Sequence, residues 1–186
     1  MSYLKLIFKT LEDQIISQVL AGNINAYRDL ILKYQHMVMA LSLRLLKNPE
    51  DAEELAQDVF LKAFENLSTF KGDAKFSSWL YTINYRLGLN ILKKKKIDIA
   101  EYSEYEYQLP DSSENIMEKT IKMEKNNALK KAIDNLAPQD AYIIQLYYYE
   151  EMSIEEISKI VLMTETNVKT RLFRSRKQLQ KHYSNN

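Results

Sequence analysis

The chain has 186 residues, 46% of them hydrophobic, and a formal net charge of +1 at pH 7. That much hydrophobic material can build one medium domain or two small ones, each with its own core, which excludes a disordered polypeptide. The sequence has no Cys, which excludes disulfides, thiolate metal sites and a Cys nucleophile. Its two His residues, His36 and His182, lie far apart in the sequence, so we expect no bound metal and no other cofactor.

The composition also bears on fold class and location. Only 3 Gly and 3 Pro occur beside many Leu, Ile, Lys, Glu and Ala, so helices with short connections are favoured and the predicted class is all-α. The N-terminal residues MSYLKLIFKTLEDQ hold too short an apolar run for a signal peptide. No stretch approaches the roughly 20 apolar residues that span a bilayer. We therefore expect a reduced, cytoplasmic location and no membrane insertion.

Two helices are predicted in the N-terminal half. Apolar residues recur with helical spacing from Tyr27 to Leu45. A second helix starts after Asn48, because this N-cap residue is followed by Pro49 and two acids, and its apolar stripe continues to Leu67. We expect the two helices to pack as an antiparallel hairpin.

The opposite face of the second helix is polar apart from Leu61. Glu54, Gln57, Asp58 and Glu65 lie on that face, and Leu61 points almost directly away from the apolar stripe. A single exposed Leu is ordinary on a protein surface. An exposed Leu among acids and Gln is also typical of a protein-docking surface, and the composition leaves both interpretations open.

A loop and a third helix are predicted before the lysine run 93–96. Gly72 and the Asp after it indicate a turn. Ser77 or Ser78 can cap a helix that begins near Trp79 and runs to the lysines.

Two uses are open for the aromatic residues around this loop. The third helix carries Tyr81 and Tyr85 away from its apolar face. Aromatic side chains mixed with Asn, Arg and Lys suit single-stranded DNA, which needs stacking surfaces and neutralised phosphates. Alternatively, Phe70, Phe76 and Trp79 fill a small core, which is the role that we favour for Trp79.

Charge is strongly segregated along the rest of the chain. Residues 97–118 hold seven acids and no base, and Pro110 interrupts any helical period, so we interpret 97–122 as a flexible acidic linker. No acid follows Glu165. A cationic C-terminal tip fits DNA contact, although cationic helix ends are also common solvated surfaces. The basic residues of this tip are Lys169, Arg171, Arg174, Arg176, Lys177 and Lys181.

The C-terminal residues predict a helix-turn-helix. Pro138 suits the first turn of a supporting helix, and Ser153 with a Glu three residues later forms a capping-box pattern. After a break at 162–163, Thr164 can cap a second, cationic helix. The start of such a helix reads base edges, and its later basic residues contact phosphates. The predicted base contacts are Thr166, Asn167, Lys169 and Thr170, and the predicted phosphate contacts are Arg171, Arg174 and Lys177. Helical bundles without a DNA role can show the same pattern.

Two segments of the sequence are similar to a known family. NPEDAEELAQDVFLKAFENLSTFKGDAKFSSWLYTI, from Asn48, resembles region 2 of the extracytoplasmic-function (ECF) sigma factors of the sigma-70 family. LAPQDAYIIQLYYYEEMSIEEISKIVLMTETNVKTRLFRSRKQL, from Leu136, resembles their region 4. The similarity runs from about Ala26 to Lys181 in the family's order. It implies two small helical domains joined by the linker: an extension at 1–22, region 2 at 23–96, the linker at 97–122 and region 4 at 123–186.

The resemblance implies a function without bond chemistry, so we expect no enzyme. Such a chain binds core RNA polymerase and directs promoter recognition, melting and initiation. The clamp helices of the beta-prime subunit would bind the face that carries Leu61, which favours the docking interpretation of that residue. The implied docking residues are Asp51, Glu54, Gln57, Asp58 and Leu61.

The resemblance also implies the DNA contacts and further partners. The loop and the third helix would bind the -10 element of the promoter through Phe70, Lys71, Lys75, Phe76, Ser77, Ile83, Asn84 and Arg86. Region 4 would bind the -35 element and the beta flap, and the linker would thread near the active centre. Family members are commonly held by an anti-sigma factor, so we expect such a partner here.

Three residues depart from the family pattern. Arg86 and Asn90 stand where the family commonly has Asn and Asp, so the preferred -10 base is not predicted. Leu162 stands where members usually have Gly in the turn of the helix-turn-helix. A bulky residue with positive φ costs on the order of 1 kcal/mol, which favours a different turn geometry here.

Other functions stay open on the residues alone. A stand-alone helix-turn-helix regulator would bind a palindrome as a dimer, without polymerase. A carboxylate-metal hydrolase would use the acids from Asp51 to Glu65, but the sequence has no Glu-x-x-His pair. A structural adaptor would leave the cationic helix without a purpose. The sigma-factor interpretation assumes two separately folded modules that leave Leu61 and the surface from Arg171 to Lys177 exposed.

Overall fold

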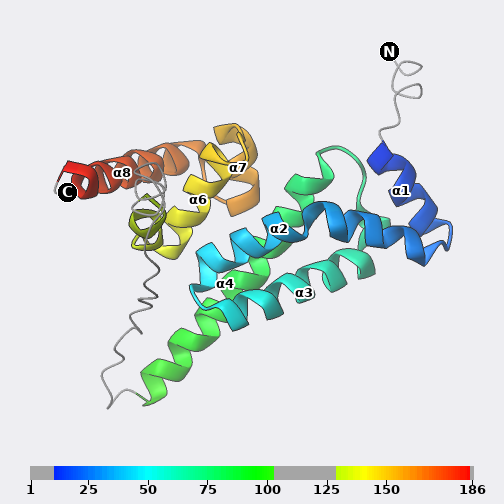
Figure 1. Ribbon diagram of the computed structural model, residues 1–186, viewed down its shortest axis with the longest axis horizontal. Helices are drawn as coiled ribbons and strands as arrows, with labels where there is room; N and C mark the ends of the chain where they lie inside the picture. The colour runs from blue at the N-terminus through cyan, green and yellow to red at the C-terminus, as the bar shows by residue number, and fades with distance from the viewer. Residues whose placement is uncertain (1–10, 103–128, 185–186) are drawn as a thin grey trace, which may run out of the picture.

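The computed structural model describes residues 11–102 and 129–184 (Figure 1). Every regular element in these two ranges is helical, and no strand occurs in them, which confirms the predicted all-α class. Most of the predicted linker, residues 103–122, lies outside the described residues. The helices are α1 (Leu11–Leu20), α2 (Tyr27–Leu46), α3 (Pro49–Glu65), α4 (Phe76–Tyr102), α6 (Pro138–Tyr148), α7 (Ile154–Val161) and α8 (Glu165–Ser184). Short 3-10 turns lie at Ile24–Ala26 and Leu67–Thr69, and residues 129–134 are helical as well.

α2 and α3 form the predicted hairpin. The Asp51 N–H donates a hydrogen bond to the Asn48 side chain at 2.9 Å, and Pro49 is the first residue of α3, so the predicted start of this helix is confirmed. One face of α3 is buried, and its buried residues are Ala52, Leu55, Ala56, Val59, Phe60 and Ala63. Both helices also pack against α4.

α4 begins one turn earlier than predicted. Its first residue is Phe76 rather than Trp79. The Trp79 N–H donates to the Lys75 carbonyl at 3.2 Å, so Ser77 lies inside the first turn and does not cap the helix. The Phe76 ring contacts the rings of Phe70 and Trp79, each at 5.5 Å between centroids. This aromatic packing accounts for the early start.

α4 also continues past the lysine run to Tyr102, so residues 97–102 of the predicted linker are helical. Ala100 and Glu101 in this stretch are strong helix formers, and the stretch has no Gly or Pro. At Gly88 the helix passes close to α2, because a Cβ atom there would lie 2.6 Å from Leu45 Cδ1. None of the described helices is both long and apolar enough to cross a bilayer.

The C-terminal half has the predicted helix-turn-helix. The Ser153 Oγ accepts a hydrogen bond from the Glu156 N–H and the Glu156 carboxylate accepts one from the Ser153 N–H, which confirms the capping box of α7. The Asn167 N–H donates to the Thr164 hydroxyl at 3.2 Å, as expected for a cap of α8. Leu162 ends α7 in the left-handed region, with φ 54° and ψ 44°. The expected change of turn geometry is therefore wrong, and Leu adopts the conformation that Gly favours.

The predicted two helical domains are confirmed, and the two halves also pack against each other. α6 contacts α2, and α7 contacts α4 (Figure 1). One cluster of buried residues joins Leu41 and Tyr85 of the N-terminal half to Tyr142 and Ile157 of the C-terminal half. The physical reason is that α4 has a second apolar face, opposite the one that packs on α2 and α3.

Candidate protein-docking and nucleic-acid surfaces

The exposed face of α3 carries the predicted docking residues in one stripe. Asp51, Glu54, Asp58 and Leu61 are three or four positions apart, which puts them on one side of a helix. Leu61 is 59% exposed although it is a large apolar side chain. Asp51 forms an ion pair with Lys95 of α4, whereas no ion pair of Glu54 or Asp58 is seen among the described residues. Gln57 is exposed next to this stripe.

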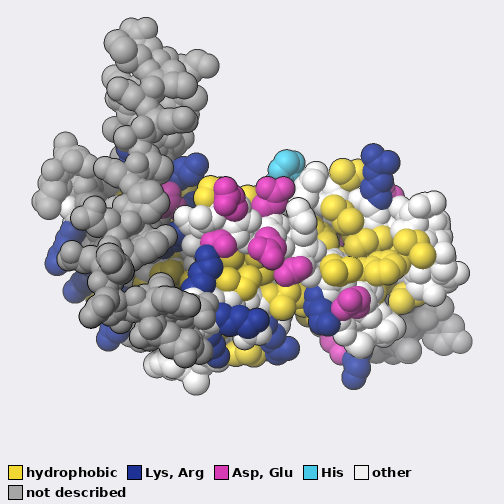
Figure 2. Space-filling model, turned by 90° about the horizontal axis from the view of Figure 1, so that it is seen from below, with side chains coloured by type: hydrophobic (Ala, Val, Ile, Leu, Met, Phe, Trp, Pro, Cys, Tyr) yellow, Lys and Arg dark blue, Asp and Glu magenta, His cyan; other side chains and the backbone are white. Residues whose placement is uncertain are grey.

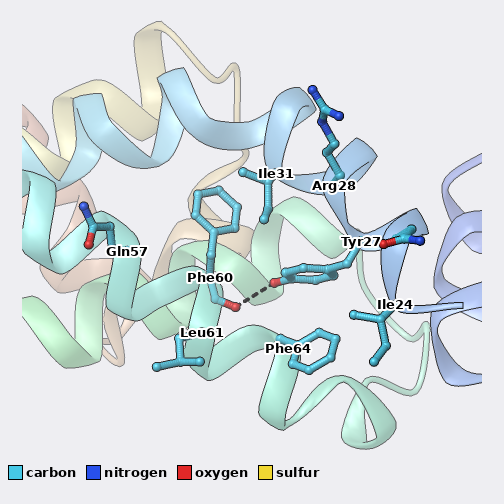
Figure 3. Close-up of a pocket in the computed structure, with 9 residues that line it drawn as sticks. Ile24, Tyr27, Arg28, Ile31, Gln57, Phe60, Leu61 and Phe64 are labelled. Atoms are coloured by element: carbon cyan, nitrogen blue, oxygen red, sulfur yellow. Dashed lines mark hydrogen bonds between the residues drawn. The ribbon is translucent and has the colours of Figure 1, made fainter. Parts of the chain in front are cut away.

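An apolar groove lies beside Leu61, between α3 and the start of α2. It has a volume of about 750 Å³ and is lined by Ile24, Asn25, Tyr27, Arg28, Ile31, Gln57, Phe60, Leu61 and Phe64 (Figure 3). The Tyr27 hydroxyl donates to the Phe60 carbonyl at 2.7 Å, which ties the two helices together at the groove. Figure 2 shows acidic side chains gathered beside a hydrophobic area on one face of the molecule.

Most of this groove was not predicted from the sequence. Ile24 is 63% exposed, and the sequence placed Ile31 only in the helical stripe of α2. A signal was present, because α3 has two exposed or half-exposed apolar residues, Leu61 and Phe64, outside the buried stripe. The sequence could not show that a 3-10 turn brings Ile24 next to them.

The basic loop before α4 lies beside an aromatic cluster. The Phe70 and Trp79 rings are 5.4 Å apart, and both contact Phe76. Phe76 is only 3% exposed, so it supports the cluster from inside and is not available for direct DNA contact, contrary to the prediction. Lys71 and Lys75 are exposed.

The same loop forms one wall of a hollow of about 430 Å³ whose other wall comes from the C-terminal half. Glu156, Lys159 and Ile160 of α7 line it opposite the loop residues. The pKa of the Glu156 carboxyl is lowered, first by the hydrogen bonds from Ser153 and also by the positive charge of Lys75. The loop and α7 therefore face each other across this hollow.

The predicted DNA contacts on α4 divide into exposed and buried residues. Arg86 is exposed, and Ser77 and Ile83 are half-buried. Asn84 is fully buried and its side-chain amide donates to the Ser42 hydroxyl of α2 at 2.7 Å. The predicted DNA contact of Asn84 is thus wrong for this conformation, because its helical position faces the packed interior.

The predicted base contacts at the start of α8 are accessible. Thr166, Asn167, Lys169 and Thr170 are all exposed. Lys169 lies 3.4 Å from Glu165, an exposed i, i+4 pair of the kind that contributes little to stability.

The predicted phosphate contacts differ from one another. Arg174 and Lys177 are exposed. Arg171 is half-buried and its guanidinium donates to Asp140 of α6 at 2.6 Å. Arg171 therefore orients α8 on α6 and is not free to bind a phosphate in this conformation.

Burial at the contact between the halves raises the pKa of two side chains, Tyr81 and Glu150. The pKa of the Tyr81 hydroxyl is raised by burial and by the nearby Glu150 carboxylate. The pKa of Glu150 is raised by burial, and hydrogen bonds from Tyr81 and Gln145 oppose the rise. The Tyr81 hydroxyl donates to Glu150 across the contact at 3.3 Å.

Both halves of the chain match known protein families. Residues 30–96 match the family model of sigma-70 region 2, and residues 126–179 match that of sigma-70 region 4. The ECF RNA polymerase sigma factor SigW of Bacillus subtilis is 32% identical over 89% of this chain and 93% of its own length. The RNA polymerase sigma-H factor of Pseudomonas aeruginosa is 28% identical over 91% of this chain and 92% of its own.

Solved structures show the same fold. The sigma factor RpoE of Bartonella quintana, in complex with the anti-sigma factor NepR, has a TM-score of 0.71 and 20% identity over 85% of this chain and 96% of its own. CnrH, in complex with the cytosolic domain of CnrY, has a TM-score of 0.63 and 16% identity over 92% of this chain and 96% of its own.

Proposed function

This chain belongs to the ECF RNA polymerase sigma factors, and we propose that it carries out their task through three surfaces: the α3 face, the loop before α4, and the start of α8. It directs promoter recognition and transcription initiation. Full-length similarity to sigma factors rejects the alternative of a stand-alone dimeric regulator.

The polymerase binds the α3 face and the groove beside it. The observation that carries this proposal is Leu61, which is 59% exposed within an acidic stripe and at the edge of an apolar groove. A partner helix that fits would present basic residues to Glu54 and Asp58 and an apolar residue to the groove. Such a combination of an apolar anchor and a charged rim is typical of protein interfaces. Docking on the beta-prime clamp helices uses Asp51, Glu54, Gln57, Asp58 and Leu61.

The -10 element binds at the loop before α4 and at the first turns of that helix. Phe70 supplies a ring for stacking, while Lys71, Lys75 and Arg86 neutralise phosphates, and Ser77 and Ile83 border the same region. Asn84 and Phe76 have a supporting role, since both are buried. Holding an unpaired base there stabilises melting, because unstacking costs a few kcal/mol that pocket contacts must offset.

The -35 element binds at the start of α8, where Thr166, Asn167, Lys169 and Thr170 contact bases. Arg174 and Lys177 contact phosphates, and the same domain docks on the beta flap. Arg171 joins them only if its ion pair with Asp140 opens. Each phosphate contact releases counterions, so the affinity falls as salt rises.

The proposal also includes a protein that regulates this chain and the compartment in which the chain acts. Two solved structures of this fold each contain a partner protein: RpoE is bound to the anti-sigma factor NepR, and CnrH is bound to the cytosolic domain of CnrY. This chain has an anti-sigma factor of its own, acts in the cytoplasm where polymerase works, and performs no bond chemistry itself.

Run-off transcription with purified core RNA polymerase on genomic fragments tests the proposal. The wild-type chain should give promoter-specific transcripts that core polymerase alone does not give. Leu61→Glu should abolish them, whereas Leu32→Glu, at a Leu that is 51% exposed on α2, should not. Arg174→Ala should weaken promoters that depend on the -35 element. The proposal fails if no transcript depends on the added chain.

A further inference from the structure

The groove beside Leu61 presents a large apolar surface to water. Ile24 and Leu61 are 63% and 59% exposed, and the Phe64 ring lines the same groove (Figure 3). Its volume of about 750 Å³ lies in the range of about 300–1,000 Å³ in which protein pockets enclose a drug-sized ligand. Removal of apolar area from water is the main favourable term in association. The groove therefore favours an occupant that presents several apolar side chains.

The N-terminal segment, residues 1–10, has the composition that such a groove would bind. It contains no acid and two bases, Lys5 and Lys9. Its large apolar residues after Met1 are Tyr3, Leu4, Leu6, Ile7 and Phe8. The segment lies outside the described residues, and it precedes the part of the chain that matches sigma-70 region 2, which begins at residue 30. The family match therefore does not account for this apolar run.

The first described helix, α1, starts within reach of the groove. Glu12, in the first turn of α1, accepts a hydrogen bond from the Tyr34 hydroxyl at 2.7 Å and pairs with Lys33 at 3.0 Å, so the start of α1 is held against α2. Tyr34 is three residues from Ile31, a lining residue of the groove, which is about 4.5 Å along the helix axis. Ten extended residues span up to about 33 Å. A helix is only about 10–12 Å wide, so the segment before α1 is long enough to pass around α2 into the groove.

The charges of the segment and of the groove edge are complementary. Glu54 and Asp58 of α3 each lie three residues before a lining residue of the groove, so both flank it. Neither carboxylate forms an ion pair within 11–102 and 129–184, the ranges that the structure describes. The basic lining residue, Arg28, belongs to α2, on the other side. An occupant with Lys5 and Lys9 next to apolar side chains thus matches the α3 edge.

We propose that residues 1–10 of the same chain bind in the groove beside Leu61, and that core RNA polymerase must displace them to dock on α3. The apolar side chains of the segment fill the groove, and its lysines face Glu54 and Asp58. This inference rests on the proposed docking function of the α3 face. It makes the N-terminal segment a competitor of polymerase, which lowers the apparent affinity of the chain for polymerase.

The covalent connection favours this occupant over a second copy of the chain. A short connecting segment gives an effective concentration of about millimolar. A second copy reaches the same local concentration only when the protein itself is that concentrated. The segment therefore occupies the groove at low protein concentration even if its intrinsic affinity is weak.

Disulfide trapping in the full-length chain is the first measurement. The chain has no Cys, so Ile7→Cys with Gln57→Cys places one thiol in the segment and one at the groove. Ile7→Cys with Glu155→Cys, at an exposed residue of α7, is the matched control. In a glutathione redox buffer the first pair should form an intrachain disulfide about tenfold more readily than the control pair. Equal yields overturn the proposal, and so does a disulfide that joins two copies of the chain.

The affinity for core RNA polymerase is the second measurement. If the groove is free for one tenth of the time, the chain binds about tenfold more weakly than a chain whose groove is always free. Ile7→Asp places a negative charge in the apolar groove beside two acids, so it should release the segment and tighten binding by up to about tenfold. Leu32→Asp, at an exposed Leu of α2 that does not line the groove, should bind like wild type. An unchanged or weaker affinity of Ile7→Asp overturns the proposal.

Leu61→Glu separates failure of this inference from failure of the proposed docking. It should lower both the disulfide yield of the groove pair and the affinity for polymerase. If the affinity falls while the groove pair and the control pair give equal yields in the parent chain, only the inference is wrong. If the affinity does not change, the α3 face is not the docking surface, and competition with polymerase is wrong with it.

Discussion

The turn between α7 and α8 allows the cost of a left-handed backbone conformation to be measured. Leu162 in this turn occupies the left-handed region with φ 54° and ψ 44°. A Cβ atom costs about 1–2 kcal/mol in that region. Gly avoids this cost but loses about 0.5–1 kcal/mol more backbone entropy on folding. With the midpoint of each range, the net advantage of Gly at this position is about 0.75 kcal/mol over a residue with a Cβ atom and no further contacts.

The matched comparison is Leu162→Gly against Leu162→Ala. Leu162 is 61% exposed, and both variants lose the same remaining contacts of its side chain. Their difference in stability thus reports the backbone conformation alone. Leu162→Gly should be the more stable of the two by about 0.5–1 kcal/mol, or about 1–4 °C in melting temperature. Urea denaturation followed by circular dichroism measures the difference, and equal stability, or a more stable Ala variant, would refute the strained turn.

Three further predictions concern caps, packing and pH. Ser153→Ala removes the capping hydrogen bond to Glu156 and should lower the free energy of unfolding by about 1 kcal/mol in urea denaturation. Gly88→Ala should cost about 1–3 kcal/mol in the same assay, since its Cβ would lie 2.6 Å from Leu45 Cδ1. Burial raises the pKa of Glu150 above its ordinary 4.5, so the folded state binds a proton more readily than the unfolded state. This contribution is complete below pH 4.5 and is lost as the pH rises through the raised pKa. Glu150→Gln should therefore flatten melting temperature against pH above 4.5, and an unchanged slope would contradict the assigned cause.

Helix starts marked by caps and prolines were predictable to the residue. Asn48 and Pro49 begin α3, Pro138 begins α6, and Ser153 caps α7, as expected from the sequence. These signals are local, because a capping side chain bonds to a backbone group only two or three residues away. The start of α4 was mispredicted because Phe76 is held by aromatic packing, which depends on residues that the chain brings together only on folding.

The sequence left open whether the two halves pack together, although α6 carries a signal for the contact. Six consecutive residues, 141–146, are buried. A helix at the edge of a small domain buries one stripe, whereas a helix that is buried all round needs neighbours on more than one side. The C-terminal half supplies α8 on one side of α6, so the remaining apolar face had to meet another partner. The sequence alone could not identify α2 as that partner, because the two helices are separated by the linker.

For the candidate site residues, the sequence predicted which side chains lie on an exposed helix face. It did not predict which of them contact a side chain of another helix. The helical spacing placed Leu61 and Arg174 on exposed faces, where the structure has them. Periodicity gives the direction of a side chain but not what stands opposite it. Arg171 meets Asp140, and Asn84 meets Ser42, across contacts between helices far apart in sequence.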